Sequence, residues 1–269
     1  MTMSSFASTP SAPTRSPLIV SIEGNIGAGK STFLEKLREN LGEEGSTLEV
    51  VFMQEPVNVW QSITDKYGED ILTKYYADPA KYAFSFQIMA YSTRLAMFKT
   101  AVREHPNCDV ILCERSLEAD RNIFAKMLRD EGNIEDIMYQ IYDRLYADTA
   151  QDYLADGIVY MATPPMICYD RIQQRNRKGE SEIAMPYLMN CHAYHTAWLA
   201  NQTDLEEKTE VLSLDTDDAQ HPEEDWVQRV SDFLVHLVQK QSLARVRRFY
   251  GSRAKSHPPG DSDAISSIA

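Results

Sequence analysis

The segment from Gly24 to Ser31 carries the residues whose types and spacing most clearly predict chemistry. Its sequence, Gly24-Asn25-Ile26-Gly27-Ala28-Gly29-Lys30-Ser31, fits the pattern G-x-x-x-x-G-K-[ST] of a phosphate-binding loop. In such a loop, backbone N–H groups and the positive end of the following helix converge to stabilise polyphosphate charge. We expect Lys30 to contact the β- and γ-phosphates and the Ser31 hydroxyl to bind Mg²⁺. Together with Thr32, this segment is the candidate site for ATP or another nucleoside triphosphate.

Two other stretches place charged side chains directly after predicted strands. The predicted strand over residues 48–53 is followed by Gln54-Glu55-Pro56. The predicted strand over residues 110–113 is followed by Glu114-Arg115-Ser116. Ligands of open α/β sheets bind at the edge formed by the carboxyl ends of the strands. Glu114 is therefore a candidate Mg²⁺ ligand, and Arg115 could pair with that carboxylate or with a phosphate. The alternatives are that Glu55 only decorates the surface and that Glu114 and Arg115 form a structural ion pair.

A long apolar-periodic run over residues 75–101 predicts a helix that starts at Asp78-Pro79. Gln87 and Arg94 lie seven residues apart and therefore share one face of it. Neighbours on that stretch are Phe86 and Ala90. A glutamine amide donates and accepts hydrogen bonds at once, which suits the edge of a nucleobase. The alternative is a half-exposed helix without a ligand.

A cluster of cations follows the fourth predicted strand. Thr163-Pro164-Pro165 predicts a helix with Thr163 as its N-cap and a proline at its first position. The cations on and after this helix are Arg171, Arg175, Arg177 and Lys178, with Gly179 and Glu180 next. A solvated basic face would explain such a run. The more specific interpretation is a lid that places its arginine side chains over the phosphoryl group during transfer.

Composition restricts the other partners. The chain has 269 residues, 43% of them apolar, and a formal net charge of −13, so a nucleic-acid backbone is not an expected partner. No apolar run approaches the roughly 18–20 residues that span a bilayer, so we expect no membrane association. The four cysteines have neither metal-site nor C-x-x-C spacing, which favours a reducing compartment. We expect the cytoplasm, with the mitochondrion as the alternative because residues 1–17 lack acidic side chains.

The predicted elements alternate between strand and helix. The expected strands cover residues 18–22, 48–53, 110–113, 157–161 and 211–214, and a closing helix covers residues 226–237. This alternation predicts one α/β domain around a parallel sheet. We expect a disordered tail over residues 1–17, the domain over 18–241, and a basic, then disordered, tail over 242–269.

These stretches together resemble the deoxynucleoside kinase family, most closely its deoxycytidine/deoxyguanosine kinase branch, between Ile19 and about Leu199. The matching motifs are Gly24–Ser31, Glu55-Pro56-Val57 with Trp60, Asp78-Pro79 with Phe86-Gln87, Glu114-Arg115-Ser116, Arg171–Arg177, and Tyr187-Leu188 leading to Trp198-Leu199. The resemblance implies a P-loop kinase fold with a five-stranded parallel sheet flanked by helices, an Arg-rich lid and a homodimer. It implies transfer of the γ-phosphoryl group of Mg-ATP to the 5′-hydroxyl of a deoxynucleoside.

The resemblance also implies roles for individual residues. Glu55 resembles the general base that takes the proton of the 5′-hydroxyl. Arg115 resembles the residue that holds the 5′-oxygen and the Glu55 carboxylate in place. Tyr76 and Glu180 match the pair that binds the sugar 3′-hydroxyl. The remaining matches are Gln87 as reader of the base, Trp60 and Phe124 as aromatic walls, Arg175 and Arg177 as lid arginines, and Arg171 as the start of the lid motif.

The residues that match the base pocket are Ala90, Arg94 and Asp120; Asp120 and Phe124 share a helix face by their i,i+4 spacing. An Arg94–Asp120 pair would fill the space of a thymine methyl, so we expect deoxycytidine, deoxyadenosine or deoxyguanosine to be preferred over thymidine. One alternative is a nucleoside-monophosphate kinase of the thymidylate type, although Glu55 would repel the acceptor's phosphate. Another is a non-catalytic accessory subunit, which would be free to lose Lys30, Glu55 or Arg115. The sequence departs from the family at Gly179, where many relatives are acidic, which leaves the flexibility of the lid open.

Overall fold

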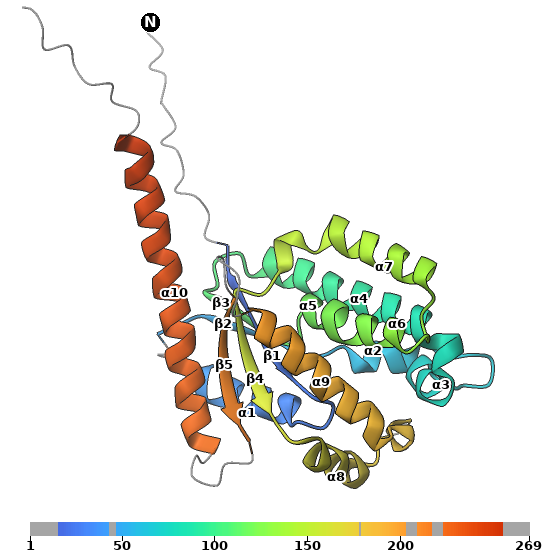
Figure 1. Cartoon of the computed structure of the whole chain (residues 1–269). Coiled ribbons are helices and arrows are strands. Elements are labelled where there is room, and N and C mark those ends of the chain that lie inside the picture. The colour runs from blue at the N-terminus through green and yellow to red at the C-terminus, as the bar shows by residue number, and fades with distance from the viewer. Residues whose placement is uncertain (1–15, 43–46, 178, 203–208, 217–222, 255–269) are drawn as a thin grey trace, which may run out of the picture.

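The computed structural model describes residues 16–42, 47–177, 179–202, 209–216 and 223–254. Its centre is a parallel sheet in the order β2-β3-β1-β4-β5 (Figure 1). The strands are β1 (Leu18–Gly24), β2 (Val50–Met53), β3 (Val110–Glu114), β4 (Gly157–Ala162) and β5 (Glu210–Asp215). This confirms the predicted α/β fold with five parallel strands, and the strand ends differ from the prediction by one or two residues.

The helices follow the strands in the alternating order that the sequence predicts. Long helices are α1 (Lys30–Leu41), α4 (Pro79–Glu104), α7 (Asp136–Thr149), α8 (Pro165–Arg175), α9 (Met185–Gln202) and α10 (Glu223–Ala254). Short ones are α2 (Val57–Ser62), α3 (Ile71–Ala77), α5 (Leu117–Ala119), η1 (Asp120–Ala125), α6 (Lys126–Asp130), η2 (Gln151–Tyr153) and η3 (Glu180–Glu182). No helix in the described part of the chain combines the length and apolar character needed to cross a bilayer.

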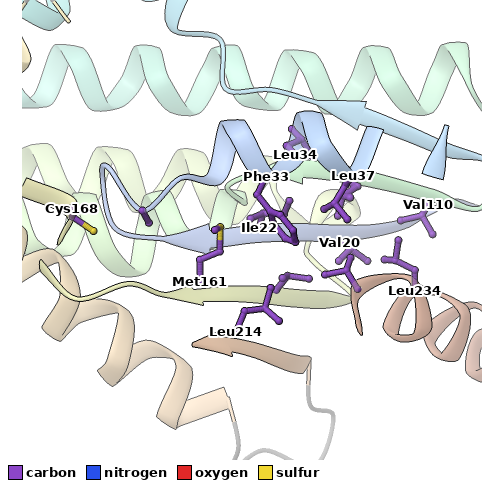
Figure 2. Packing of buried hydrophobic residues seen from close by; sticks show 14 of the residues in the cluster. Val20, Ile22, Phe33, Leu34, Leu37, Val110, Met161, Cys168, Leu214 and Leu234 are labelled. Atoms are coloured by element: carbon purple, nitrogen blue, oxygen red, sulfur yellow. The ribbon is translucent and has the colours of Figure 1, made fainter. Parts of the chain in front are cut away.

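The three central strands, β1, β3 and β4, are buried on both faces, as their continuous apolar runs predict. Val20 and Ile22 of β1 point to the side where α1 and α10 pack, with Phe33 and Leu234 among their neighbours (Figure 2). Ile19, one position away, belongs to the cluster with Tyr91 of α4 on the other side. Because successive side chains in a strand alternate between faces, the two clusters fix β1 between two helical layers (Figure 1). The loop that follows β1 therefore leaves a rigid base.

The helix predicted to start at Asp78-Pro79 does so: α4 has Asp78 as its N-cap and Pro79 as its first residue. Asp78 also ends α3, and its φ of −146° is one that a following proline favours. Two other predicted boundaries need correction. Thr163 is not the N-cap of α8; Pro164 occupies that position and Pro165 is the first helical residue. The Thr163 hydroxyl instead lies 2.7 Å from the hydroxyl of Thr216. Finally, α10 continues to Ala254, so the basic residues after 241 begin within a helix.

The two predicted disordered tails fall mostly outside the described residues. Of the N-terminal segment, only Ser16 and Pro17 are described, immediately before β1. At the other end, residues 255–269 lie outside the described part of the chain. The division into a domain and two tails stays a prediction.

Candidate active site

A cavity of about 450 Å³ opens at the carboxyl ends of β1, β2 and β3. Its lining combines the phosphate-binding loop, the two charged strand ends, the Gln87 face of α4 and the segment predicted to form a lid. Predicted site residues that line it are Ile26, Gly27, Gly29, Lys30, Ser31, Thr32, Glu55, Trp60, Tyr76, Phe86, Gln87, Ala90, Arg94, Glu114, Arg115, Asp120, Phe124, Arg175, Arg177 and Glu180. Segments far apart in the sequence thus meet at one edge of the sheet, as predicted for an open α/β fold.

Four predicted nucleotide-binding residues, namely Gly24, Asn25, Ala28 and Arg171, do not line this cavity but belong to the loop or support it. Arg171 Nη1 donates a hydrogen bond of 3.0 Å to the carbonyl oxygen of Ala28. Gly27 has a φ of +80°, and a Cβ at this position would lie 2.5 Å from the carbonyl oxygen of Cys168 in α8. Glycine at this position therefore allows the loop to pack directly on the helix that carries the lid.

Lys30 is buried, with 4% of its surface exposed, and its Nζ donates to the backbone oxygen of Asn25 at 2.8 Å. Burial lowers the pKa of Lys30 to about 8, and the positive charge of Arg115 contributes to this decrease. A bound polyphosphate would add negative charge beside this ammonium group and favour its charged form.

Ser31 and Glu114 provide oxygen ligands of the kind that Mg²⁺ prefers. The Ser31 hydroxyl donates to Glu114 Oε1 at 3.0 Å, so the end of β3 meets the start of α1. Among the described residues, no group of three or more His, Cys, Asp or Glu side chains could hold a metal ion. A hydroxyl and one carboxylate fit Mg²⁺ that arrives with phosphates, because this ion usually keeps few protein ligands.

Glu55 is held between two arginines. Its Oε1 accepts a hydrogen bond of 2.6 Å from Arg94 Nη2 and lies 3.5 Å from Arg115 Nε. Arg94 also forms a short ion pair with Asp120, and both of these side chains are almost fully buried. Burial tends to raise the pKa of Glu55, but Arg115 and Arg94 outweigh it and keep that pKa below its ordinary value. Glu55 is therefore an ionised carboxylate at neutral pH, and it does not merely decorate the surface.

The conformation of Arg115 depends on Glu23, which the sequence analysis did not single out. Arg115 has a φ of +66°, in the left-handed region that non-glycine residues rarely adopt. Glu23 of β1 accepts hydrogen bonds from the backbone N–H and the hydroxyl of Ser116, each 2.8 Å long. These bonds fix the turn that points Arg115 into the cavity. Glu23 lies in a buried apolar strand, and this unusual position for a carboxylate is the signal that could have identified it.

Aromatic rings enclose the part of the cavity that faces α4. The Trp60 and Phe86 rings meet edge to face at 5.4 Å, and Phe86 stacks on Tyr75 at 4.6 Å. Phe124 lies beneath the Arg115 guanidinium, 4.7 Å away. Gln87 is 2% exposed and lines the cavity, and its Nε2 donates to the Asp120 backbone oxygen at 3.3 Å.

The sequence analysis gave no site role to the other lining residues, namely Gln54, Val57, Asn58, Leu72, Tyr75 and Tyr187, although three of them lie in motifs that it named. Tyr75 and Tyr187 are joined by a hydroxyl contact of 3.1 Å. Their aromatic character is a weak signal, because buried tyrosines are common in cores without ligands.

Asp120 and Phe124 both line the cavity, but they do not lie on the α-helix that their spacing suggested. They belong to η1, a π-helical turn over Asp120–Ala125. Such a turn inserts one extra residue and rotates the side chains that follow it. Asp120 is consequently able to reach Arg94 while Phe124 packs against Arg115.

Arg175 and Arg177, the arginines of the predicted lid, converge on Glu180. Arg175 binds both carboxylate oxygens of Glu180, at 2.7 and 2.8 Å, and Arg177 Nη1 lies 3.2 Å from Oε1. The two arginines are about one-third exposed, whereas Glu180 is buried. Gly179, with a φ of +86°, packs against Thr73 of α3. Lys178 lies outside the described residues.

A first prediction concerns pH. Phosphate binding needs the protonated form of Lys30, whose pKa is about 8. We expect the affinity for Mg-ATP to be constant well below that pKa and to fall about tenfold for each pH unit above it. Calorimetric titration at a series of pH values on both sides of this pKa measures the affinity. The variant Lys30→Met should bind Mg-ATP weakly at every pH, and its affinity should not fall as the pH rises. Wild-type affinity that stays flat through the alkaline range would contradict the assignment.

Comparison with known proteins identifies the family. The model of the family described as deoxynucleoside kinase matches residues 20–235. A probable deoxycytidine kinase of fowlpox virus is 36% identical over 200 residues, which cover 74% of this chain and 78% of the relative. Deoxycytidine kinase of Homo sapiens is 33% identical over 244 residues, which cover 81% of this chain and 91% of that relative. A mitochondrial deoxyguanosine kinase of Xenopus laevis is 29% identical over 203 residues, which cover 68% of this chain and 74% of that relative. The chain belongs to the deoxynucleoside kinase family.

Proposed function

We propose that this protein transfers the γ-phosphoryl group of Mg-ATP to the 5′-hydroxyl of a deoxynucleoside, a step of nucleotide salvage. One observation carries the proposal: an ionised carboxylate, Glu55, shares a cavity with the lysine of a phosphate-binding loop. A carboxylate in reach of a hydroxyl can accept its proton, and a phosphate-binding loop brings the group that the hydroxyl attacks. The kinases among its relatives support this reaction class.

The reaction would rest on positioning and charge stabilisation. Glu55 would take the proton of the 5′-hydroxyl as the 5′-oxygen bonds to the γ-phosphorus. The bond from that phosphorus to the oxygen bridging the β- and γ-phosphates breaks at the same time, which releases ADP, and Arg115 orients the hydroxyl and the carboxylate. Lys30 and the lid arginines Arg175 and Arg177 stabilise the negative charge on the phosphates. Ser31 and Glu114 would hold Mg²⁺, which supplies charge neutralisation on the phosphate oxygens.

The acceptor would occupy the aromatic part of the cavity. Gln87 lies at its buried end and can both donate to and accept from a base edge. Rings of Trp60, Phe86 and Phe124 enclose this region and could stack on or abut a planar base. Tyr76 and Glu180 would bind the sugar 3′-hydroxyl.

The choice of base would depend on the pair formed by Arg94 and Asp120. Both side chains are buried and in contact, so they occupy a fixed volume near Ala90 and Gln87. A thymine methyl would have to displace this pair, whereas a base with an amino group could hydrogen-bond to it. We therefore propose deoxycytidine, deoxyadenosine and deoxyguanosine as the preferred acceptors.

The two alternatives receive less support. A thymidylate-type kinase would have to bring a phosphate dianion next to Glu55, and Arg94 and Arg115 are already engaged with that carboxylate. A non-catalytic accessory subunit would not need Lys30, Glu55 and Arg115 to converge on one cavity, as they do. For the compartment we propose the cytoplasm, with the mitochondrion as the alternative.

The first test of the proposal compares acceptors. With Mg-ATP as donor, we expect phosphorylation of deoxycytidine, deoxyadenosine or deoxyguanosine with a higher kcat/KM than that of thymidine. Deoxynucleoside monophosphates offered in competition should not be phosphorylated. Thymidine as the best acceptor would overturn the proposed base choice, and a monophosphate as the best acceptor would favour the thymidylate-type alternative.

The second test removes the proposed base. Glu55→Ala should lower kcat on the order of 10²–10⁴-fold, because no other group would accept the hydroxyl proton. Glu55→Gln keeps the shape of the side chain and should show a similar loss, which separates charge from packing. Glu69→Gln, an exposed carboxylate that pairs with Lys74, serves as the control. A loss below about threefold in Glu55→Ala would reject the role of general base.

We also propose that the protein forms a homodimer, and α7 offers a suitable face. Ile137 and Ile141 lie one helical turn apart on α7 and are 65% and 55% exposed. Isolated exposed isoleucines are ordinary, but two on one helix face fit an interface between copies. We expect light scattering to give a dimer mass for the wild type and a monomer mass for Ile137→Glu/Ile141→Glu. Met166→Glu, an exposed apolar site on α8, should leave the dimer intact. A dimer that survives the double substitution would exclude this face.

A further inference from the structure

Asn25 has a buried side chain that the phosphate-binding pattern does not explain. Position 25 is one of the variable positions in G-x-x-x-x-G-K-[ST], and the pattern assigns chemistry only to the backbone there. Yet the residue is 3% exposed and does not line the cavity. Its amide must therefore serve contacts within the protein, because a buried amide without partners is costly.

Both ends of the Asn25 amide have partners. Its Oδ1 accepts a hydrogen bond of 2.9 Å from the backbone N–H of Ile26, within the loop. Its Nδ2 donates a bond of 2.8 Å to the carbonyl oxygen of Leu188, in the first turn of α9. The backbone oxygen of the same residue accepts the bond from Lys30 Nζ. Asn25 thus connects the loop, its lysine and a helix 163 positions away in the sequence.

The helix that Asn25 reaches also forms a wall of the acceptor region. Tyr187, next to Leu188, lines the cavity, and its hydroxyl lies 3.1 Å from that of Tyr75. Tyr75 in turn stacks on Phe86 at 4.6 Å. A continuous set of contacts therefore runs from the phosphate-binding loop through Asn25 and α9 to the rings of the acceptor region.

We propose that Asn25 is a positioning residue that fixes the phosphate-binding loop relative to the acceptor pocket through Leu188 and Tyr187. This inference rests on the proposed function and assigns a role to a side chain that does not line the cavity. Phosphoryl transfer depends on the placement of two reactants, and a displacement of about 1 Å can reduce the rate on the order of 100-fold. A link between the donor loop and the acceptor wall should act on that placement.

Two substitutions separate this role from simple stability. Asn25→Ala removes both hydrogen bonds. Asn25→Ser keeps a hydroxyl that can accept from the nearby Ile26 N–H, but it is too short to donate to Leu188. The matched control is Asn190→Ala, on the exposed side of the same helix, where the side-chain amide donates to Glu131 Oε1 at 2.8 Å. This control substitution removes a side-chain hydrogen bond of equal length that lies away from the cavity.

The experiment measures kcat with the preferred deoxynucleoside, the equilibrium Kd of Mg-ATP and of that deoxynucleoside separately, and the thermal midpoint. We expect Asn25→Ser to lower kcat on the order of 10- to 100-fold at temperatures where it is folded, with each Kd changed less than about threefold. Asn25→Ala should lose at least as much activity, and Asn190→Ala should keep wild-type kcat.

Each other outcome has a distinct meaning. If the wild type phosphorylates no deoxynucleoside, the proposed function fails. If the wild type is active and Asn25→Ser retains its kcat with only a lowered midpoint, the amide is structural and the positioning role is wrong. If the Kd of Mg-ATP rises in proportion to the loss of activity, Asn25 shapes the loop alone and the link to the acceptor wall is rejected.

Discussion

The site depends on a partly buried carboxylate that stays charged because two arginines surround it. Glu55 touches Arg94 at 2.6 Å and lies 3.5 Å from Arg115, and Arg94 is itself paired with Asp120. Two negative and two positive side chains are therefore balanced inside one small volume. Removing a single member would leave an uncompensated charge, and such a charge is far more costly in a protein interior than at a surface. This group of four charged side chains is therefore the chemical centre of the site. Every helix or strand that supplies one of them must place it close to the other three.

The parallel sheet allows four elements to meet this constraint. Glu55 follows β2, Arg115 follows β3, and the phosphate-binding loop follows β1, so three neighbouring strands deliver their loops to the same edge. The helix α4 and the π-helical turn η1 supply Arg94 and Asp120 from one side of that edge. The left-handed backbone at Arg115 is tolerated because Glu23 holds the adjacent Ser116.

The positions of residues relative to strands could be predicted, whereas many of their partners could not. Glu55, Glu114 and Ser31 line one cavity, and this proximity could be expected because a strand end is visible in an apolar run and its direction follows from the fold. Their roles in binding and catalysis stay predictions. The contacts of Arg175 and Arg177 with Glu180 depend on how the segment after α8 packs, and no local pattern encodes them. The same holds for the bond between Asn25 and Leu188, which joins segments far apart in the chain. The π-helical turn escaped prediction because an extra residue in a helix leaves the apolar periodicity almost unchanged.

The most direct test of the central claim measures the charge state of Glu55 itself. A carboxyl-labelled sample, titrated by ¹³C NMR and assigned with Glu55→Gln, gives the pKa of this one side chain in the folded protein. The two arginines should hold that pKa below the ordinary value of 4.5, so that the carboxylate is ionised throughout the neutral range. A pKa above the ordinary value would mean that burial outweighs the arginines and would contradict the account. If that pKa reached the neutral range, Glu55 would be largely protonated and could not serve as a base there.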